Sequence, residues 1–231
     1  MHGYMGKLLR LDLNAGRLWA EPLNEAYARA YVGGSGLAAR YLYDMVDGHT
    51  DPLGPDNPLV FMTGPLVGTA MPSAGRYTVC ALSPLTRLWG EANSGGFWGP
   101  ELRFAGYDGI LVTGRAERPL WLSIVEGQAE LHDAASLWRL DSYATQEEVR
   151  AALGEPRARV ACIGPAGENR VKMAAVMNDH GRAAGRTGMG AVMGSKNLKA
   201  IAVRGSAQVS LSDPDGFRQL ARQIAAAVDE D

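Results

Sequence analysis

Apolar residues in this chain recur mostly in short runs or at every second position, a pattern that predicts many short β-strands. Turn residues at Asn14-Ala15-Gly16 and at Glu126-Gly127 join two pairs of these runs into hairpins. The expected strands are Lys7–Leu13, Arg17–Pro22, Leu59–Met62, Arg76–Leu82, Gly109–Val112, Leu120–Val125, Ala129–Leu131, Val160–Ile163 and Ala200–Val203.

Shorter helical patterns lie between the strands. Asn24 is a typical N-cap for a first helix, Gly33-Gly34 interrupts it, and Ser35 is expected to cap a second. The second helix has one apolar face, which consists of Leu37, Tyr41, Leu42, Met45 and Val46.

Three further helix starts are predicted. Pro100 is expected at the first position of a short helix, and Thr145 with Glu148 forms a capping box for a helix that continues to Leu153. Asp213 and Pro214 begin a last helix, whose apolar residues at helical spacing are Phe217, Leu220, Ile224 and Val228.

The strand pattern repeats once along the chain. A strand followed by Gly-Pro occurs at Gly64-Pro65 and again at Gly164-Pro165, an offset of 100, and Gly109–Ala116 matches Ala200–Ala207 at an offset of 91. At an offset of 90, Asn93 falls on Ala183.

This repeat predicts an α+β fold of two similar, intertwined halves, with β-sheets and short helices related by a pseudo-two-fold axis. Superposing residues 1–115 on residues 116–207 should align the two Gly-Pro turns. Chance similarity between glycine-rich turns is the alternative.

The stretch from Asn178 to Lys199 alternates glycine with Arg182 and Arg186. Glycines allow close approach of the backbone and positive φ, and guanidinium groups bind anions, so we expect a loop that holds a phosphorylated ligand. A positive φ at Gly185 would make a β-branched replacement there disruptive. The alternative is a tight connection whose arginines lie in solvent. The spacing matches neither a P-loop nor a dinucleotide-binding motif.

The repeat pairs this stretch with the glycine segment Asn93–Gly96. Two matched glycine loops would face a shared site, and a ligand with two similar phosphorylated arms would suit it.

Composition narrows the class of protein. The chain has 231 residues, 46% of them hydrophobic. Its formal charge of −2 does not indicate a nucleic-acid-binding protein, which would usually be basic. The 29 glycines lie among apolar strands and therefore indicate ordered loops. No apolar run reaches transmembrane length and no signal peptide is evident, so we expect a cytoplasmic protein without a membrane partner.

The sequence shows no set of side chains with the spacing of a metal site. Cys80 and Cys162 lie in apolar runs and are expected to be core residues, and two cysteines cannot hold an Fe–S cluster with four thiolates. The four histidines show no metal-type spacing.

Several longer blocks of sequence resemble the N-terminal domain of the tungsten-containing aldehyde ferredoxin oxidoreductases, and the match covers residues 3–207. The blocks are Gly3–Leu13, Gly64–Thr69, Gly75–Tyr77, Ser83–Thr86, Ala92–Gly96, Ala105–Asp108, Ile163–Asn169 and Gly190–Val203.

The resemblance implies a cofactor of two pterin dithiolenes that share one tungsten, or molybdenum in some relatives, with magnesium between their phosphates. The backbone carbonyls of Asn93 and Ala183 would reach the magnesium. All four sulfur ligands would come from the pterins, which agrees with the lack of a cysteine cluster. The implied cofactor-binding residues are Arg76, Asn93, Ser94, Gly95, Arg182, Ala183, Ala184, Gly185 and Arg186.

The resemblance also implies an activity for the complete protein. An aldehyde would be oxidised to a carboxylic acid, and two electrons would leave through a [4Fe–4S] cluster to ferredoxin. The cluster and the acid/base residues belong to downstream helical domains of the family. We therefore expect a cofactor-binding domain at residues 1–210, and at 211–231 the start of a helix that leads into a missing region; a natural short subunit is the alternative.

Other functions stay open at this point. An aryl-CoA reductase subunit or a carboxylic acid reductase would share this domain, and a non-catalytic module that stores or delivers the pterin is the rival from another class. A homodimer is an option that the sequence leaves open. No catalytic residue can be named, and Asp108, Glu168 and Asp179 are expected to anchor loops.

Overall fold

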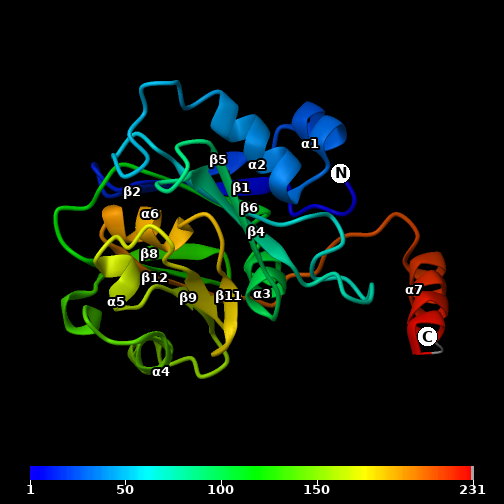
Figure 1. Ribbon diagram of the computed structural model, residues 1–231. Coiled ribbons are helices and arrows are strands. Elements are labelled where there is room, and N and C mark those ends of the chain that lie inside the picture. The colour runs from blue at the N-terminus through cyan, green and yellow to red at the C-terminus, as the bar shows by residue number, and fades with distance from the viewer. Residues whose placement is uncertain (230–231) are drawn as a thin grey trace.

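The computed structural model describes residues 1–229 and contains two six-stranded mixed β-sheets (Figure 1). In the first sheet the strand order is β2-β1-β6-β3-β4-β5. Its strands are β1 (Lys7–Asp12), β2 (Arg17–Pro22), β3 (Leu59–Met62), β4 (Tyr77–Leu82), β5 (Trp89–Ser94) and β6 (Gly109–Thr113).

The second sheet has the same topology as the first. Read from its β8 edge, the order is β8-β7-β12-β9-β10-β11, so each strand has a counterpart in the first sheet. The one parallel pair of each sheet is also equivalent, β1 with β6 and β7 with β12. The strands are β7 (Leu120–Val125), β8 (Gln128–Asp133), β9 (Arg159–Cys162), β10 (Val176–Asn178), β11 (Arg182–Ala184) and β12 (Leu198–Arg204).

This shared topology confirms the prediction of two similar halves. Gly64-Pro65 follows β3 and Gly164-Pro165 follows β9, and these two strands occupy equivalent places in their sheets. The repeat seen in the sequence is therefore a repeat of the fold.

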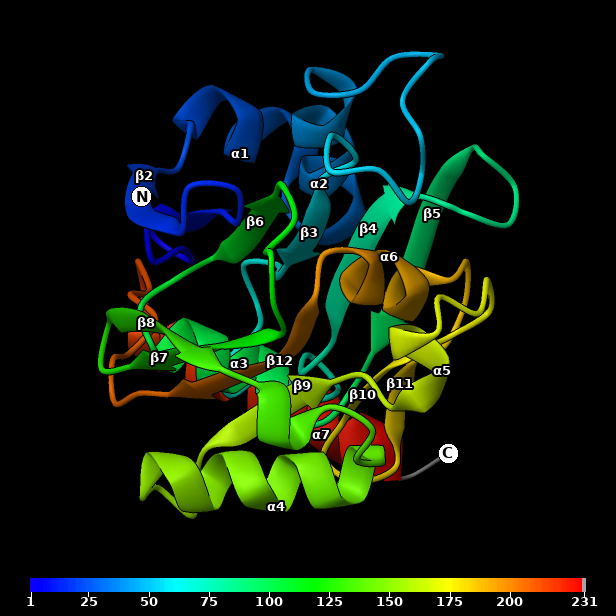
Figure 2. The ribbon, with the colours of Figure 1, turned by 90° about the vertical axis from the view of Figure 1, so that its left-hand side faces the viewer.

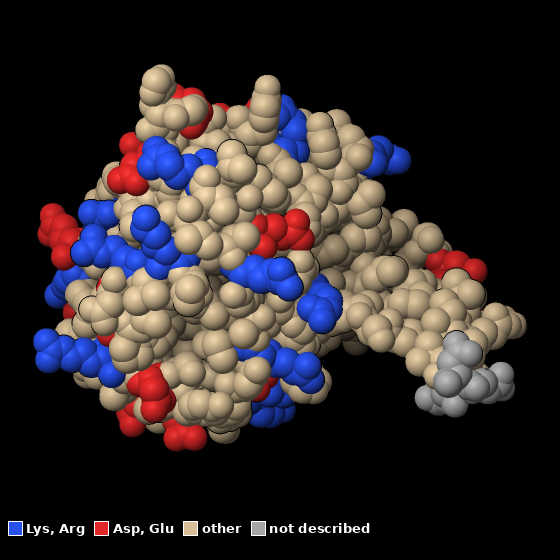
Figure 3. Space-filling view, viewed as in Figure 1, with Lys and Arg blue, Asp and Glu red and all other residues tan. Residues whose placement is uncertain are grey.

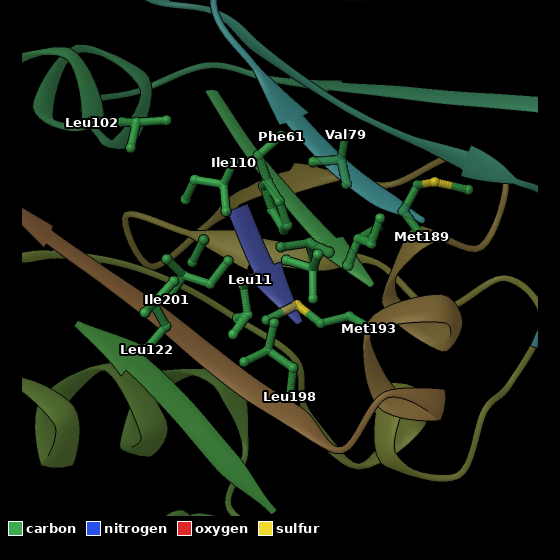
Figure 4. Close-up of a cluster of buried hydrophobic side chains, with 14 of the residues drawn as sticks. Leu11, Phe61, Val79, Leu102, Ile110, Leu122, Met189, Met193, Leu198 and Ile201 are labelled. Atoms are coloured by element: carbon green, nitrogen blue, oxygen red, sulfur yellow. The ribbon is translucent and has the colours of Figure 1, made fainter. Parts of the chain in front are cut away.

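The inner faces of the two sheets pack against each other and form the largest core (Figure 4). Leu11, Phe61 and Ile110 from the first sheet meet Leu122 and Ile201 from the second. Helices cover the outer faces: α1 (Glu25–Tyr31) and α2 (Gly34–Tyr43) lie on the first sheet, and α4 (Ser142–Leu153) lies on the second (Figure 2). The layers are thus helix, sheet, sheet, helix.

Two equivalent helices cross between the halves. The helix α3 (Trp98–Phe104) follows β5 and contacts β9 and β12 of the second sheet, while α6 (Met189–Ser195) follows β11 and contacts β3, β4 and β5 of the first. The indole N–H of Trp98 donates to the carbonyl of Ile201 at 3.0 Å. This exchange of helices makes the halves intertwined, as predicted.

Three helix starts differ from the sequence-based expectation. Gly33, and not Ser35, precedes α2, and α3 begins two residues before Pro100. The capping box was wrong, because Asp141 caps α4 by accepting from the N–H groups of Tyr143 and Ala144. The Thr145 hydroxyl donates to the Asp141 carbonyl from inside the helix.

Three strands were also missed. β5 and β11 end in or lie within the two glycine segments, and their sequences are rich in small and polar residues, while β10, Val176–Asn178, is only three residues long. Their strand geometry comes from pairing with neighbours within the two sheets.

The remaining elements are short or peripheral. They are the 3-10 turn η1 (Ala135–Leu137), α5 (Pro165–Glu168) and the terminal α7 (Pro214–Asp229), which projects from the body of the molecule (Figure 1). The start of α7 at Pro214 is as predicted, and Leu220, Ile224 and Val228 on it are exposed. Within residues 1–229, no helix combines the length and apolar character needed to cross a membrane.

Candidate functional site

The two predicted glycine segments meet where the edge strands β5 and β11 contact each other. Asn93 is the next-to-last residue of β5, and Ala183 is the next-to-last residue of β11. The following residues, Ser94 and Ala184, pair with the first residues of β4 and β10, respectively. Asn93 and Ala183 therefore occupy equivalent positions, as the offset of 90 indicated.

Arg76 and Asn93 line a common open cavity of about 440 Å³. Thr78 forms part of its wall, and its hydroxyl donates to the Asn93 side-chain oxygen at 3.4 Å. The opposite walls are the backbone segments Gly33–Ser35 and Gly64–Val67. Neither of these segments was assigned to the site from the sequence, although the double glycine before a helix was a usable signal for the first.

A strained turn brings this backbone segment to the cavity. Val32 has φ 63° and ψ −65°, and the Gly33 N–H donates to the Tyr31 carbonyl at 2.7 Å, which is a γ-turn of the rare kind. The Tyr4 hydroxyl donates to the Val32 carbonyl at 2.6 Å. Strain at a β-branched residue persists only where its surroundings hold it, and such positions cluster at functional sites.

The glycine- and arginine-containing stretch that begins at Asn178 forms a hairpin and not the loop that was expected. β10 and β11 are joined by Asp179, His180 and Gly181, and the first two of these have positive φ. Arg182, Ala183, Gly185 and Arg186 are exposed along the edge, and none of them lines the cavity that Arg76 lines.

The condition stated for Gly185, a positive φ, is not met. Its φ is not positive, and a Cβ placed there would meet only the Ala183 Cβ, at 3.7 Å. In this part of the chain the left-handed conformation falls instead on Thr187 and Gly188.

Arg76, Arg182 and Arg186 are exposed, and within residues 1–229 none of them forms an ion pair or a side-chain hydrogen bond. Lys and Arg side chains gather in a band across the middle of one face of the molecule, at the level of α6 (Figure 3). Guanidinium groups that have no carboxylate partner are free to bind an anion.

Two of the predicted residues turn their side chains inward. Ala184 is fully buried in the main core, and the buried Ser94 hydroxyl donates to the Asn178 side-chain oxygen at 2.6 Å. A ligand could therefore meet Ser94 and Ala184 only through their backbone.

The three loop-anchoring carboxylates are confirmed. Asp108 accepts from the N–H groups of Met5 and Gly6, Glu168 accepts from the N–H of Arg139, and Asp179 accepts from the N–H of Phe97. None of the three therefore needs a catalytic role to explain its burial.

The cysteines offer no thiolate at this site. Cys80 and Cys162 are both free and buried, and burial raises the pKa of the Cys162 thiol to about 12. Among residues 1–229, no three His, Cys, Asp or Glu side chains are grouped so that they could hold a metal ion. A metal near the two segments would therefore depend on backbone oxygens or on ligands from a cofactor.

Comparison with known proteins gives one consistent result. The family model described as "Aldehyde ferredoxin oxidoreductase, N-terminal domain" matches residues 8–205. The tungsten-containing aldehyde ferredoxin oxidoreductase of Pyrococcus furiosus is 46% identical over 223 residues, which are 96% of this chain and 37% of that protein. The protein of the same name from Thermococcus kodakarensis is 45% identical over the same shares.

Two other similar proteins have names that describe different substrates. The aliphatic sulfonate oxidoreductase, WOR-like subunit, of P. furiosus is 35% identical over 241 residues, which cover 97% of this chain and 38% of that protein. A chain in the active site complex BamBC of benzoyl coenzyme A reductase, with 1,5-dienoyl-CoA, has a TM-score of 0.97 and 36% identity. The match covers 99% of this chain and 35% of that chain.

The chain thus spans well under half the length of the curated relatives it matches. The matched residues contain both sheets and both edge-strand segments. The chain belongs to the aldehyde ferredoxin oxidoreductase family and corresponds to its N-terminal domain.

Proposed function

We propose that this chain binds a tungsten or molybdenum bis-pterin, as the N-terminal domain of an oxidoreductase that oxidises aldehydes to carboxylic acids. Electrons would pass through a [4Fe–4S] cluster, held by a downstream region, to ferredoxin. The names of the relatives that are 45–46% identical to the chain support this assignment.

The observation that carries the proposal is the meeting of two equivalent edge strands, each beside arginines that have no carboxylate partner within residues 1–229. Arg76 from the first half, with Arg182 and Arg186 from the second, would offset the charge of two phosphates. The duplicated fold supplies two similar contact surfaces for two similar arms.

The backbone at the seam, where the edge strands β5 and β11 meet, fits such a ligand. A Cβ at Gly95 would meet no protein atom within 4 Å, so packing within the domain does not require glycine there and leaves room for a ligand. The carbonyls of Asn93 and Ala183 are hard oxygen ligands of the kind magnesium accepts. The fold fixes both carbonyls at equivalent points of the two edges.

The bound cofactor would supply the redox chemistry, and the residues of this chain would bind and orient it. The arginines would neutralise phosphate charge, and the backbone of Asn93–Gly95 and Ala183–Gly185 would set the position of each arm. No acid/base residue for the reaction is assigned to this chain. We place the protein in the cytoplasm, with the downstream domains of the same protein as its first partner.

A second candidate function rests on the similarity to BamBC. The TM-score of 0.97 favours, as the alternative, a related reductase that acts on an aryl-CoA or another carbonyl compound. Assays of the complete protein with aldehydes and with an aryl-CoA thioester, each with matched electron carriers, distinguish the two functions.

Arg182→Ala in the complete protein tests the cofactor assignment. Loss of a charge-assisted hydrogen bond, typically worth about 1.5–3 kcal/mol, should lower pterin affinity roughly ten- to hundred-fold. Arg222→Ala is the matched control, because Arg222 is an exposed arginine on the projecting α7. Tungsten and pterin content of the purified proteins is the measurement, and equal content in both variants would contradict the assignment.

Gly185→Val is a second test of the same site. Because the domain itself has room for a side chain at Gly185, folding should be unaffected and any loss of pterin would report a clash with the ligand. Full pterin content in this variant would remove Gly185 from the proposed contact surface.

A further inference from the structure

The side chain of Asn178 joins the two halves of the molecule at the seam between the edge strands. Asn178 ends β10 in the second sheet and is completely buried. Its side-chain oxygen accepts from the hydroxyls of Tyr77 at 3.0 Å and Ser94 at 2.6 Å, both in the first sheet. Its side-chain nitrogen donates to the Gly95 carbonyl and to the Asp179 carboxylate, both at 2.9 Å.

These four hydrogen bonds use the full capacity of the amide and fix its orientation. The Gly95 carbonyl and the Asp179 carboxylate can only accept, so the nitrogen of Asn178 must face them. Burial raises the pKa of Tyr77, which keeps its hydroxyl a neutral donor. The Tyr77 ring is held in turn by Trp98, with 4.5 Å between ring centroids.

Asp179 extends the connection to the crossing helix α3. Its side chain is 8% exposed, and its carboxylate accepts from the N–H groups of Phe97 at 2.6 Å and Trp98 at 3.3 Å. Gly96 has φ 94°, and a Cβ there would collide with the same carboxylate oxygen. Glycine is therefore required at position 96 for this contact.

This connection exists on one side of the duplication only. The register pairs Tyr77 with Ser94 and Val176 with Ala184, so the counterpart of Asn178 in β4 is Val79, which packs in the main core. The repeat therefore conserves the strands while one half alone supplies the polar connection.

We propose that Asn178 and Asp179 are positioning residues that set the distance between the two cofactor-facing segments, Asn93–Gly95 and Arg182–Arg186. Asn178 bonds to Gly95 and pairs in register with Arg182, so one buried side chain relates the two segments to each other. The inference rests on the proposed pterin function, and it assigns no ligand contact to Asn178 itself.

The experiment uses the complete protein, produced with and without tungstate, and the variants Asn178→Ala and Asn178→Asp. Asp keeps the accepting oxygen but replaces both N–H donors by an acceptor opposite Gly95 and Asp179. We expect each variant to lose about tenfold in pterin affinity, because the two segments would no longer be held at a fixed distance before the cofactor binds. Amide hydrogen exchange at Phe97 and Trp98 should accelerate about tenfold in both variants, with or without cofactor.

Asn57→Ala is the matched control for loss of stability. Asn57 is also completely buried, and its side chain makes three hydrogen bonds, to Pro52 and to both backbone groups of Leu82. This variant should lose stability while keeping its pterin content per folded molecule and the exchange rates at Phe97 and Trp98.

The outcomes separate the two proposals. Absence of pterin from the unmodified protein would overturn the proposed function and leave the exchange measurement to test the connection. Normal pterin content in both Asn178 variants, or unchanged exchange at Phe97 and Trp98, would overturn the positioning role. Equal pterin loss in Asn57→Ala would overturn it as well, because a general loss of stability would then explain the effect.

Discussion

Each half of the molecule contains one buried ion pair, and the two pairs place opposite charges at equivalent positions. In the first half, Asp108 pairs with Arg103 at 3.0 Å, and in the second half Lys199 pairs with Glu168. Asp108 and Lys199 are related by the same offset of 91 that aligns the closing strands β6 and β12.

Both pairs anchor the segment that follows the equivalent strands β3 and β9. Arg103 donates to the carbonyl of Gly64, directly after β3, and Glu168 lies in α5, directly after β9. Lys199 also donates to the Leu140 carbonyl at 2.9 Å. The comparison shows that the duplication preserved a structural task and its location, while the residues and even the signs of charge changed.

Breaking the first pair should have the largest effect. Asp108→Ala leaves the Arg103 guanidinium buried without its carboxylate, which typically costs about 3–5 kcal/mol. Glu168→Ala should cost less, because Glu168 accepts from one backbone N–H, that of Arg139, whereas Asp108 accepts from two, those of Met5 and Gly6. Denaturant unfolding of both variants measures the difference.

The control for this prediction lies on α7, where Arg218 and Asp215 form an exposed pair. Asp215→Ala should leave the unfolding midpoint unchanged, because exposed pairs contribute little. A loss after Glu168→Ala that equals or exceeds the loss after Asp108→Ala would contradict this ranking of the two buried pairs.

A third buried cation, Lys196, connects the halves to each other and should have an intermediate effect. Its ammonium is buried and donates to the carbonyls of Pro55 at 3.2 Å and Gly114 at 3.1 Å. Burial, with a smaller contribution from Arg115, lowers the pKa of Lys196 to about 7, and Asp56 opposes the shift.

This shift predicts a pH dependence of stability. Above pH 7 the unfolded chain keeps a proton on Lys196 that the folded chain has lost, so stability should rise with pH until the ordinary lysine pKa is reached. Between pH 7 and 9 the gain should be roughly 2 kcal/mol. Lys196→Met should remove this rise in denaturant unfolding series, and a parallel pH dependence in the variant would exclude Lys196 as its source.

The sequence predicted the fold correctly where the spacing of apolar residues and the turn residues indicated the same element. The hairpin β1–β2 and the Gly-Pro turns after β3 and β9 depend on local residue types, so their patterns were visible. β5 and β11 were missed because residues such as Asn93 and Ala183 have little intrinsic strand preference. Those strands form only because partners distant in the sequence pair with them.

The candidate site shows the same limit. Arg76, Asn93 and Arg182 were candidates because they lie in recognisable segments. In the structure Arg76 and Asn93 line one cavity, and β5, which contains Asn93, contacts β11, which contains Arg182. In the sequence, Asn178 stands out only as the first residue of a glycine-rich stretch. Its role depends on Tyr77 and on Ser94, 101 and 84 positions away, and no local pattern encodes such contacts.

The smallest predicted effect compares the helices that cover the outer faces of the two sheets. Asp141 caps the 12-residue α4 with two hydrogen bonds, whereas Asn24 caps the seven-residue α1 with one, to the N–H of Tyr27 at 3.1 Å. A carboxylate also interacts favourably with the helix dipole. Asp141→Ala should therefore cost about 1–2 kcal/mol and Asn24→Ala about 0.5–1 kcal/mol in thermal unfolding. A larger loss from Asn24→Ala would show that α1, despite its single cap bond, contributes more than α4 to holding its sheet in place.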